Sequence, residues 1–304
     1  MESFMIKNFN EMLNMVKENE VKKTVVIAAA QTDTAIEAAV LAKSENLAES
    51  ILVGDKNSIE DIIKKQFPEY EGRFQIVDTG KDLNKACAQS VSLIRENAGQ
   101  IILKGKADTA LLLKAVLDKE NGLRTGEVIS DVLAYESPER VLLMTDGGIN
   151  LYPDLNEKIS IVKNAVKVAH ALGNPMPKVA LLAAVEVVNP KMQCTLDASV
   201  IAKMNHRNQI AQCIIDGPLA FDNAINMDAA KMKGIDSPVA GQADILVVPN
   251  IEAGNIFGKC LTYYCQWRVA HVVMGTKAPI LIASRADNAE TKMLCMAMGA
   301  LSAN

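Results

Sequence analysis

The stretch TVVIAAAQTDTAIEAAVLAKSENLAESILVG, residues 24–54, reads as a buried strand, a helix and a second buried strand. Its ends, TVVIAA (24–29) and ILVG (51–54), are continuous apolar runs typical of buried parallel strands. Between them, Thr32 or Asp33 can cap a crossover helix. The apolar residues of that helix recur at helical spacing: Ile36, Ala39, Val40 and Leu41. The stretch therefore predicts a βαβ unit, and with it parallel sheet.

The same alternation continues along the chain. Further strand-like runs are FQIV (74–77), QIILKG (100–105), KVALLAA (178–184), DILVVPN (244–250) and PILIAS (279–284), with helical patterns between them. Residues 126–150 differ, because two strand-like runs flank the turn-forming ESPER and predict an antiparallel hairpin. Residues 153–175 then predict a helix that stops at Gly173 and Pro175. The fold class is therefore α/β, with a mixed sheet.

Composition limits the classes of function. A chain of 304 residues with 49% hydrophobic residues suits two domains better than one. A net charge of -4, without a run of like charges, offers no basic surface for nucleic acid. The 6 cysteines form no CxxC pair, and the N-terminal MESFMIKNFNEMLNMVKENE lacks the apolar core of a signal peptide. Because no apolar run approaches about 18 residues, we expect a soluble cytoplasmic protein that does not enter a membrane.

Several familiar site signatures are missing from the sequence. No GxGxxG follows a strand, and GNIFGKC (254–260) has three rather than four residues between its glycines, so neither a dinucleotide fold nor a phosphate loop is indicated. The histidines His170, His206 and His271 lie far apart, so no metal site is expected. Without GxSxG or a close Ser/Cys and His arrangement, any acyl chemistry would proceed by direct transfer.

The stretch KAPILIASRADNAETK (277–292) brings a serine and an arginine to the carboxyl end of a predicted strand. Ligands of open α/β sheets bind at that edge. Arg285 in this position either pairs with an acid or grips an anion with two hydrogen bonds. Asp287 and Glu290 have the D-x-x-E spacing of a helix capping box, so either acid can be purely structural.

Glycine-containing turns supply further candidate sites at KGKADTALLLK (104–114), TDGGIN (145–150) and SPVAGQAD (237–244). Backbone N–H groups at such turns, or at the start of the helix after Lys104, could hold a phosphate. Taken alone, each turn is better explained as an ordinary connection from a strand to a helix. The residues alone leave both interpretations open.

Several segments together resemble the phosphate acetyl/butyryltransferase family, and most of all its phosphate butyryltransferase branch. The matching segments, in order, are LKGKADTALLLKAVL (103–117), LLMTDGGINLYP (142–153), VNPKM (188–192), DGPLAFD (216–222), SPVAGQADILVVPNIEAGN (237–255) and GTKAPILIASRADNAETK (275–292). Their order and spacing agree over nearly the whole chain beyond the first 20 residues. The chain is therefore similar to this family along most of its length.

The resemblance implies a fold of two α/β/α domains with mixed sheets, like that of the isocitrate and isopropylmalate dehydrogenases, with the active-site cleft between the domains. On that pattern the first domain comprises residues 1–126 and 270–304, and the second comprises 127–269. The resemblance implies neither a metal nor a tightly bound cofactor, since coenzyme A and phosphate are substrates. We expect a homo-oligomer of two or more subunits.

The reaction that the resemblance implies is acyl-CoA + phosphate ⇌ acyl phosphate + CoA, run in a ternary complex with butyryl or branched short-chain acyl groups. The family's serine-arginine pair matches Ser284 and Arg285, which would offer a hydroxyl to the CoA sulfur and a positive charge to the phosphoryl group. Enzymes of the acetyl branch carry an aspartate, taken as the base, where this chain has Thr291. The adjacent Glu290 is the nearest carboxylate, and it either replaces that base or only caps the helix.

Other residues match turn positions around the cleft in the family: Lys104, Thr109, Asp146, Asn150, Lys191 and Asn255. Lys104 is the best candidate for a phosphate contact, because a lysine between a strand and a helix acts as a point charge. We therefore expect these residues to bind substrate.

Three alternatives stay open from the sequence. One is a phosphate acetyltransferase with acetyl preference, and another is a non-catalytic acyl-CoA-binding relative that has lost its base. The third is a metal- and nicotinamide-dependent dehydrogenase on the same fold. That enzyme would need clustered aspartates, and no DxxxD pair with accompanying arginines stands out.

Overall fold

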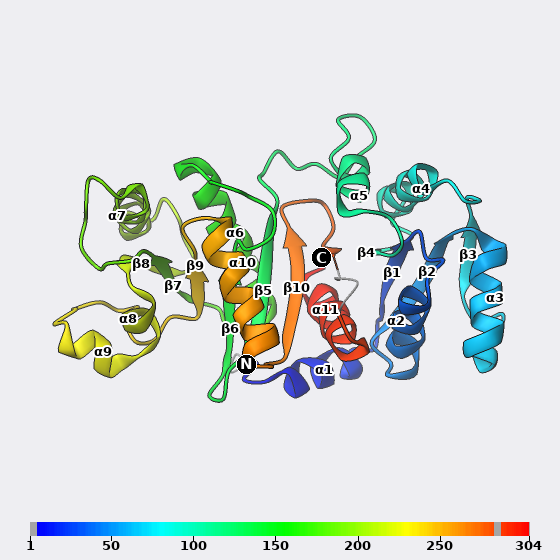
Figure 1. The fold of residues 1–304 in the computed structure, drawn as a ribbon, viewed down its shortest axis with the longest axis horizontal. Helices are drawn as coiled ribbons and strands as arrows, with labels where there is room; N and C mark the ends of the chain where they lie inside the picture. The colour runs from blue at the N-terminus through cyan, green and yellow to red at the C-terminus, as the bar shows by residue number, and fades with distance from the viewer. Residues whose placement is uncertain (1–4, 283–286, 304) are drawn as a thin grey trace. The chain divides into compact units, whose positions relative to one another are not determined.

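The computed structural model describes residues 5–282 and 287–303. The chain forms two compact units. The terminal unit comprises Asn10–Glu127 and the described residues from Ala270 onward. The central unit comprises Val128–Val269 together with the described residues up to Phe9. Figure 1 labels their helices and strands.

The terminal unit is built on a sheet with the strand order β3-β2-β1-β4-β11-β10. Its strands are β1 (Lys23–Ala28), β2 (Ala48–Gly54), β3 (Gln75–Asp78), β4 (Ile101–Lys104), β10 (Val269–Met274) and β11 (Ile280–Leu281). Each neighbouring pair from β3 to β11 is parallel, whereas β10 is antiparallel to β11. The predicted parallel sheet is therefore confirmed, with one antiparallel strand added.

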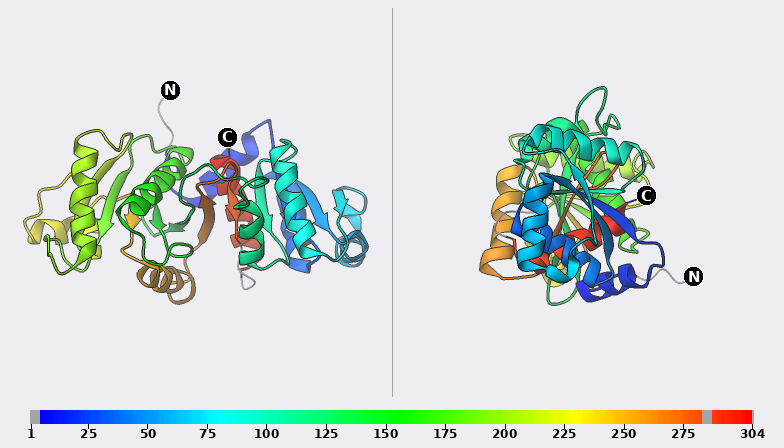
Figure 2. Two further views of the ribbon diagram at one scale, coloured as in Figure 1. Left: turned by 90° about the horizontal axis from the view of Figure 1, so that it is seen from above. Right: turned by 90° about the vertical axis from the view of Figure 1, so that its right-hand side faces the viewer.

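The helices of this unit are α1 (Phe9–Glu18), α2 (Asp33–Ser44), α3 (Lys56–Gln66), the short η1 (Pro68–Tyr70), α4 (Leu83–Arg95), α5 (Thr109–Val116) and α11 (Ala289–Ser302). Helix α2 contacts both α3 and α11, and α4 packs against α5 (Figures 1 and 2). Right-handed crossovers put α4 on the opposite face from α2 and α3, because the chain reverses direction across the sheet between β3 and β4.

The crossover helix α2 begins as its sequence predicts. Thr32 lies at its N-cap with extended backbone, and its side-chain oxygen accepts a hydrogen bond from the backbone N–H of Ala35 at 3.3 Å. This bond satisfies one of the donors that a helix start leaves open. Ile36, Ala39 and Val40 of the predicted apolar face are buried.

The central unit has a sheet of strand order β5-β6-β9-β7-β8. Its strands are β5 (Ser130–Glu136), β6 (Val141–Thr145), β7 (Lys178–Leu182), β8 (Ile214–Leu219) and β9 (Ile245–Val247). The predicted hairpin is confirmed, because β5 and β6 pair antiparallel from Leu133 with Met144 to Glu136 with Val141. The remaining pairs, β6 with β9, β9 with β7 and β7 with β8, are parallel.

The helices of the central unit are α6 (Leu155–Ala171), α7 (Gln193–His206), α8 (Phe221–Ile225), α9 (Met227–Met232) and α10 (Ile251–Lys259), which continues into the π-helical turn η2 (Cys260–Tyr264). Helix α6 confirms the prediction for residues 153–175. It starts with a complete capping box, in which Asp154 and Glu157 each accept the backbone N–H of the other.

The first described residues belong to the central unit. The backbone N–H of Ile6 donates to the carbonyl of Leu172 at 3.1 Å, and that of Val141 donates to the carbonyl of Lys7, also at 3.1 Å. These bonds tie residues 6 and 7 to β6 and to the end of α6. The predicted first domain instead grouped residues 1–9 with the rest of 1–126 and with 270–304. The two domains stay a prediction.

All 6 cysteines are free thiols. Cys87, Cys213 and Cys295 are buried, Cys194 is half-buried, and Cys260 and Cys265 are exposed at the two ends of η2. Burial raises the pKa of Cys87 and of Cys213 to about 11. In the part of the chain that the structure describes, no helix is both long and apolar enough to cross a bilayer.

A buried ion pair joins α6 to α7 in the central unit. The Nζ of Lys158 lies 2.6 Å from the Oδ2 of Asp197, and the two side chains are only 9% and 7% exposed. The other carboxylate oxygen of Asp197 accepts from the Nε2 of Gln193 at 2.8 Å. Each charge therefore has its partner, as a buried charge requires.

Replacing Asp197 by asparagine should lower the free energy of unfolding by about 3 kcal/mol, because the Lys158 ammonium would stay buried without its counter-charge. Urea denaturation of wild type and variant measures this change. The control is Glu60→Gln, which breaks an exposed pair with Lys56 at 3.7 Å and should change stability by less than about 0.5 kcal/mol. Equal losses of unfolding free energy in the two variants would contradict the larger contribution of the buried Lys158–Asp197 pair.

Candidate functional site

The carboxyl edge of the terminal sheet contains a topological switch point. From β1 the chain builds outward through β2 and β3, and β4 then joins the other side of β1. Ligands of open α/β sheets bind at such a point. Lys104 ends β4 directly beside Ala28, the last residue of β1. The sheet topology therefore puts the predicted phosphate-binding lysine at the expected place.

The loop after β4 is held tightly against the loop after β1. The backbone N–H of Gly105 donates to the carbonyl of Ala28 at 2.9 Å, and that of Lys106 donates to the carbonyl of Ala29 at 2.8 Å. A Cβ atom on Gly105 would lie 2.3 Å from the oxygen of Ala29. Only glycine fits at position 105, because the backbone approaches so closely. The two hydrogen bonds fix the direction in which the chain leaves Lys104.

Lys104 and Thr109 lie in this same connection. Lys104 is half-buried, and its Nζ lies 3.4 Å and 3.3 Å from the backbone carbonyls of Gly105 and Ala107. Thr109 is the half-buried first residue of α5. The ammonium is thus held over the loop between β4 and α5, where it donates to backbone carbonyl oxygens.

The last strand, β11, pairs with β4 at the same edge, with Leu281 beside Leu103. Ser284 and Arg285 follow three and four residues later in the sequence and lie outside the described residues. Helix α11 begins at Ala289. The candidate base Glu290 is exposed in its first turn.

The predicted capping box of Asp287 with Glu290 is wrong. The N-cap is Asn288, whose Oδ1 accepts the backbone N–H of Thr291 at 2.8 Å. Asparagine caps as well as aspartate does, and the helix starts one residue later than the D-x-x-E spacing indicates. Glu290 consequently occupies the second helical position and Thr291 the third, about 100° apart around the axis.

In the central unit, Asp146 organises the turn that follows β6. Its Oδ1 accepts the backbone N–H groups of Gly148 at 2.9 Å and Ile149 at 3.0 Å. Its Oδ2 accepts the backbone N–H of Asn150 at 3.1 Å and the Nδ2 of the same residue at 2.6 Å. Asn150 in turn donates to the carbonyl of Ile129 at 2.8 Å, which ties the turn to the residue before β5.

Asn255 joins the same turn from α10. Its Nδ2 donates to the carbonyl of Gly147 at 3.3 Å. The backbones touch beside this bond, because a Cβ on Gly254 would lie 2.7 Å from the Cα of Gly147. The structure thus brings together three predicted site residues, Asp146, Asn150 and Asn255. Lys191 is exposed in the loop before α7, with its backbone N–H bonded to Asn189 at 3.0 Å, and no described contact joins it to these three.

The buried acid beside Asp146 was not predicted. Asp131 is 9% exposed and Asp146 only 3%. Burial, and then the charge of Asp131, raise the pKa of Asp146, against the lowering effect of its hydrogen bonds to Gly148, Asn150 and Ile149. In the sequence, Asp131 lies near the start of a predicted strand, and nothing marks it as a neighbour of Asp146.

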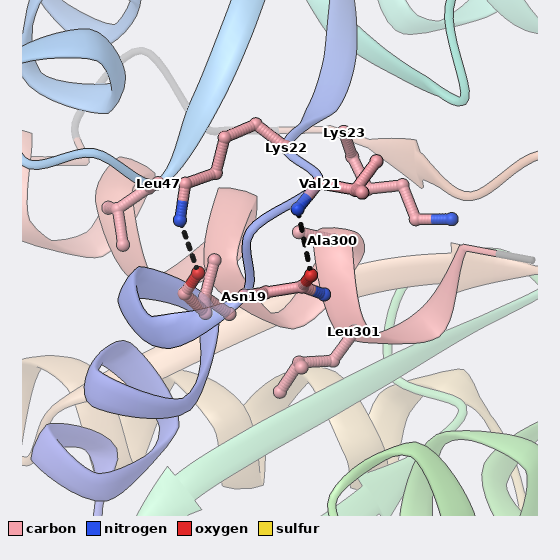
Figure 3. A pocket seen from close by; sticks show the side chains of 8 residues that line it. Asn19, Val21, Lys22, Lys23, Leu47, Ala300 and Leu301 are labelled. Carbon is pink, nitrogen blue, oxygen red and sulfur yellow. Dashed lines mark hydrogen bonds between the residues drawn. The ribbon is translucent and has the colours of Figure 1, made fainter.

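A hollow in the terminal unit lies away from these residues. Figure 3 shows it between the end of α1, the start of β1 and the end of α11, lined among others by Asn19, Lys22, Lys23 and Leu301. The Nζ of Lys22 donates to the carbonyls of Val16 and Lys17 there, and so closes the end of α1. Because Lys23 begins β1, the hollow is at the amino edge of the sheet, opposite the edge that binds ligands.

No group of three or more His, Cys, Asp or Glu side chains within residues 5–282 and 287–303 is arranged to hold a metal ion.

Comparison with known proteins identifies the family. Residues 80–300 match the model of the phosphate acetyl/butaryl transferase family. The chain belongs to this family. It is 46% identical to the phosphate butyryltransferase of Clostridium beijerinckii over 302 residues, which cover 98% of each chain. It is therefore an acyltransferase, and the predicted family is confirmed.

Solved structures agree with this assignment. A branched-chain phosphotransacylase from Enterococcus faecalis is 32% identical, with a TM-score of 0.81, and the match covers 92% of this chain and 98% of that one. A 4-hydroxythreonine-4-phosphate dehydrogenase from Klebsiella pneumoniae shares the fold alone, at 12% identity and a TM-score of 0.56, over 92% of this chain and 98% of that one. The predicted α/β fold class, with a fold like that of a dehydrogenase, is confirmed.

The raised pKa of Asp146 predicts how stability depends on pH. The pKa of Asp146 is higher in the folded than in the unfolded chain. The stability that protonation of Asp146 contributes is therefore fully present below the unfolded value near 3.8, and it is lost as pH rises through the folded value. The stability difference between wild type and Asp146→Asn should therefore shrink as pH rises from about 4 toward neutral. Urea denaturation across this range measures it.

The companion variant is Asp131→Asn, which removes the neighbouring charge. It should weaken the pH dependence contributed by Asp146, because one cause of the raised pKa is gone. A stability difference for Asp146→Asn that stays constant across the pH range would contradict the raised pKa.

Proposed function

We propose that this protein transfers butyryl or branched short-chain acyl groups reversibly between coenzyme A and phosphate. The observation that carries the proposal is the 46% identity to a phosphate butyryltransferase over 98% of both chains. The likeness to a branched-chain phosphotransacylase, at 32% identity, supports the same choice of acyl group. An acetyl preference is the less favoured alternative.

The reaction that follows needs no covalent enzyme intermediate. In the direction of thioester synthesis, the CoA thiolate attacks the carbonyl carbon of the acyl phosphate. A carbon–sulfur bond forms, the bond from carbon to the bridging oxygen breaks, and phosphate leaves with the electron pair. A thiol has a pKa near 8.5, so the enzyme must take up its proton, and the tetrahedral intermediate carries an oxyanion that needs a donor.

Ser284 and Arg285 are the proposed catalytic pair, on the match of SRADNAETK to the family's serine-arginine motif. The serine hydroxyl would hydrogen-bond the sulfur. The guanidinium would bind the phosphoryl group and the oxyanion without ever losing its own proton. In the sequence both come shortly after β11, which pairs in parallel with β4, and ligands of open α/β sheets bind at the carboxyl ends of such strands; this supports the assignment.

Glu290 is the proposed base. Its exposure in the first turn of α11 leaves its carboxylate accessible to a substrate. With Asn288 as the cap, Glu290 is not needed to bond the N-cap backbone as a capping box would require. These two observations support a chemical role over a purely structural one.

The other proposed residues bind substrate. Lys104 and Thr109 lie in the connection after β4, at the switch point of the sheet, and would contact the phosphoryl group. Asp146 and Asn150 shape the turn after β6, and Asn255 presents its amide to the same turn, where the polar groups of CoA would bind. Lys191, exposed on its loop, would act as a positive charge toward an anionic part of the substrate.

The cellular setting is part of the proposal. The protein would work in the cytoplasm as a homo-oligomer, with acyl-CoA and inorganic phosphate as its partners and no bound cofactor. The free cysteines and the net charge of -4 support this setting.

Phosphate-dependent release of CoA is the direct test. Acetyl-, butyryl- and isobutyryl-CoA are offered with phosphate, and the free thiol of CoA is followed, with phosphate omitted as the control. We expect release that requires phosphate and that favours the four-carbon substrates. Release that favours acetyl-CoA would move the assignment to the acetyl branch. Absence of release from a folded protein that binds CoA would favour a non-catalytic relative.

Replacing Arg285 by alanine should lower the rate of acyl transfer by 100-fold or more, equivalent to about 3 kcal/mol of transition-state stabilisation. The control is Arg207→Ala, which removes an exposed arginine just after α7 and should leave the rate unchanged. The melting temperature of Arg285→Ala checks that the protein folds. A rate within tenfold of wild type would remove Arg285 from the catalytic pair.

A further inference from the structure

Two exposed thiols lie at the ends of the π-helical turn η2 in the central unit. Cys260 is the first residue of this turn, and Cys265 directly follows its last residue. The other thiols of the chain are buried, apart from the half-buried Cys194. No residue that we propose for catalysis or substrate binding lies in this turn, so the proposed function leaves both thiols unused.

The backbone of the turn brings the two cysteines together. The backbone N–H of Cys265 donates to the carbonyl of Cys260 at 2.9 Å, a bond between residues five apart. In an α-helix, positions five apart are rotated by about 140° around the axis, because each residue turns by about 100°. The wider π-helical turn takes up most of this rotation, so the two positions lie one above the other on the same side.

The side chains of the two cysteines also meet. Desolvation raises the pKa of Cys265 most, followed by the charge of Cys260 and by a hydrogen bond between the two side chains. The last two effects act only between neighbouring groups. Both thiols are therefore accessible to a reagent and lie within reach of each other, which formation of a disulfide requires.

The turn that holds the two thiols is anchored to the rest of the central unit. Leu261 is only 3% exposed and belongs to the hydrophobic core, and its carbonyl accepts the backbone N–H of Trp267 at 3.1 Å. The hydroxyl of Thr262 donates to the carbonyl of Gly258 at 2.9 Å. Because the backbone is held in this way, little conformational freedom is lost when one thiol reacts with the other.

We propose that Cys260 and Cys265 form a reversible oxidation site, at which a small-molecule disulfide converts the two thiols into an intramolecular disulfide. The proposal is independent of the acyl transfer reaction. A lone exposed cysteine would stop at a mixed disulfide with the small molecule. Here the second thiol lies beside the first, so it displaces the small molecule. Exposed disulfides of this kind are labile, so small-molecule thiols reduce the site again.

The oxidation consists of two thiol–disulfide exchanges. In the first, a cysteine thiolate attacks the small disulfide RS–SR, a bond from the protein sulfur to SR forms, and RS⁻ leaves with the electron pair. In the second, the other thiolate attacks the protein sulfur, the bond between Cys260 and Cys265 forms, and the second RS⁻ leaves. The cysteines lose two protons and two electrons in total, and RS–SR becomes two RSH.

The order of attack follows from the surroundings of the two thiols. The raised pKa of Cys265 leaves less of this side chain in the reactive thiolate form. We therefore assign the first attack to Cys260 and the closing attack to Cys265.

The test treats the reduced protein with glutathione disulfide and follows the products by mass spectrometry. Both cysteines lie in one tryptic peptide, residues 260–268, between Lys259 and Arg268. In wild type this peptide should lose the mass of two hydrogen atoms, without retained glutathione, and dithiothreitol should restore it. Closure should be at least about tenfold faster in the folded protein than in urea, because the turn holds the thiols together.

Three variants test the order of attack. Cys265→Ser should react with glutathione disulfide at a rate within about twofold of wild type and stop at the mixed disulfide on Cys260. Cys260→Ser should form its mixed disulfide at least about fivefold more slowly. The control is Cys194→Ser, which removes a thiol outside the turn. It should form the disulfide in peptide 260–268 as wild type does.

Hydrogen exchange gives a second readout of the same site. The disulfide should slow exchange of the backbone N–H of Cys265, which is bonded to the carbonyl of Cys260. The proposal is overturned by a wild type that retains glutathione on either cysteine, or that joins Cys260 of two molecules. It is also overturned by a peptide that stays reduced, or by closure that is equally fast in the folded protein and in urea.

Discussion

The terminal unit depends on one set of backbone hydrogen bonds, the pairing of β4 between β1 and β11. It joins segments from opposite ends of the chain, for example through the bond from the N–H of Ile102 to the carbonyl of Pro279 at 3.1 Å. The parallel register with β1 places Lys104 beside Ala28, and that with β11 places Leu281 beside Leu103. Lys104, which we propose to contact the phosphoryl group, reaches the carboxyl edge of the sheet because of this pairing.

The sequence predicted the parallel strands because strands buried on both faces read as continuous apolar runs. It did not predict β8 or β10. The residues of β8 include Gly217 and Pro218, which indicate a turn, and the apolar run of β10 is interrupted by His271. The order of the strands in the sheet could not be predicted from the sequence either, because the pairing of distant strands does not change the periodicity of apolar residues within each strand.

The candidate site was predictable only in part. The resemblance to the family indicated that Asp146, Asn150 and Asn255 would lie together, and the structure joins them around one turn. Asp131 gave no such signal, since an acid within a strand pattern does not reveal which side chain lies opposite. The prediction of the N-cap of α11 was wrong for another reason. Asp287 and Asn288 are adjacent and both residue types cap well, so the residue at which the backbone becomes helical decides which one is the cap.

The thiols at the two ends of η2 provide a natural attachment point for spectroscopic reporters. Cys260 and Cys265 are exposed, while the thiols of Cys87, Cys213 and Cys295 are shielded. Desolvation and the neighbouring Cys260 thiol raise the pKa of Cys265. Because the thiolate is the reactive form, Cys265 should react with a maleimide or disulfide reagent near neutral pH more slowly than an unperturbed cysteine. Because η2 continues α10, a fluorophore attached there is joined to the helix that contains Asn255. A change in its emission on addition of coenzyme A would report a change in the surroundings of that helix.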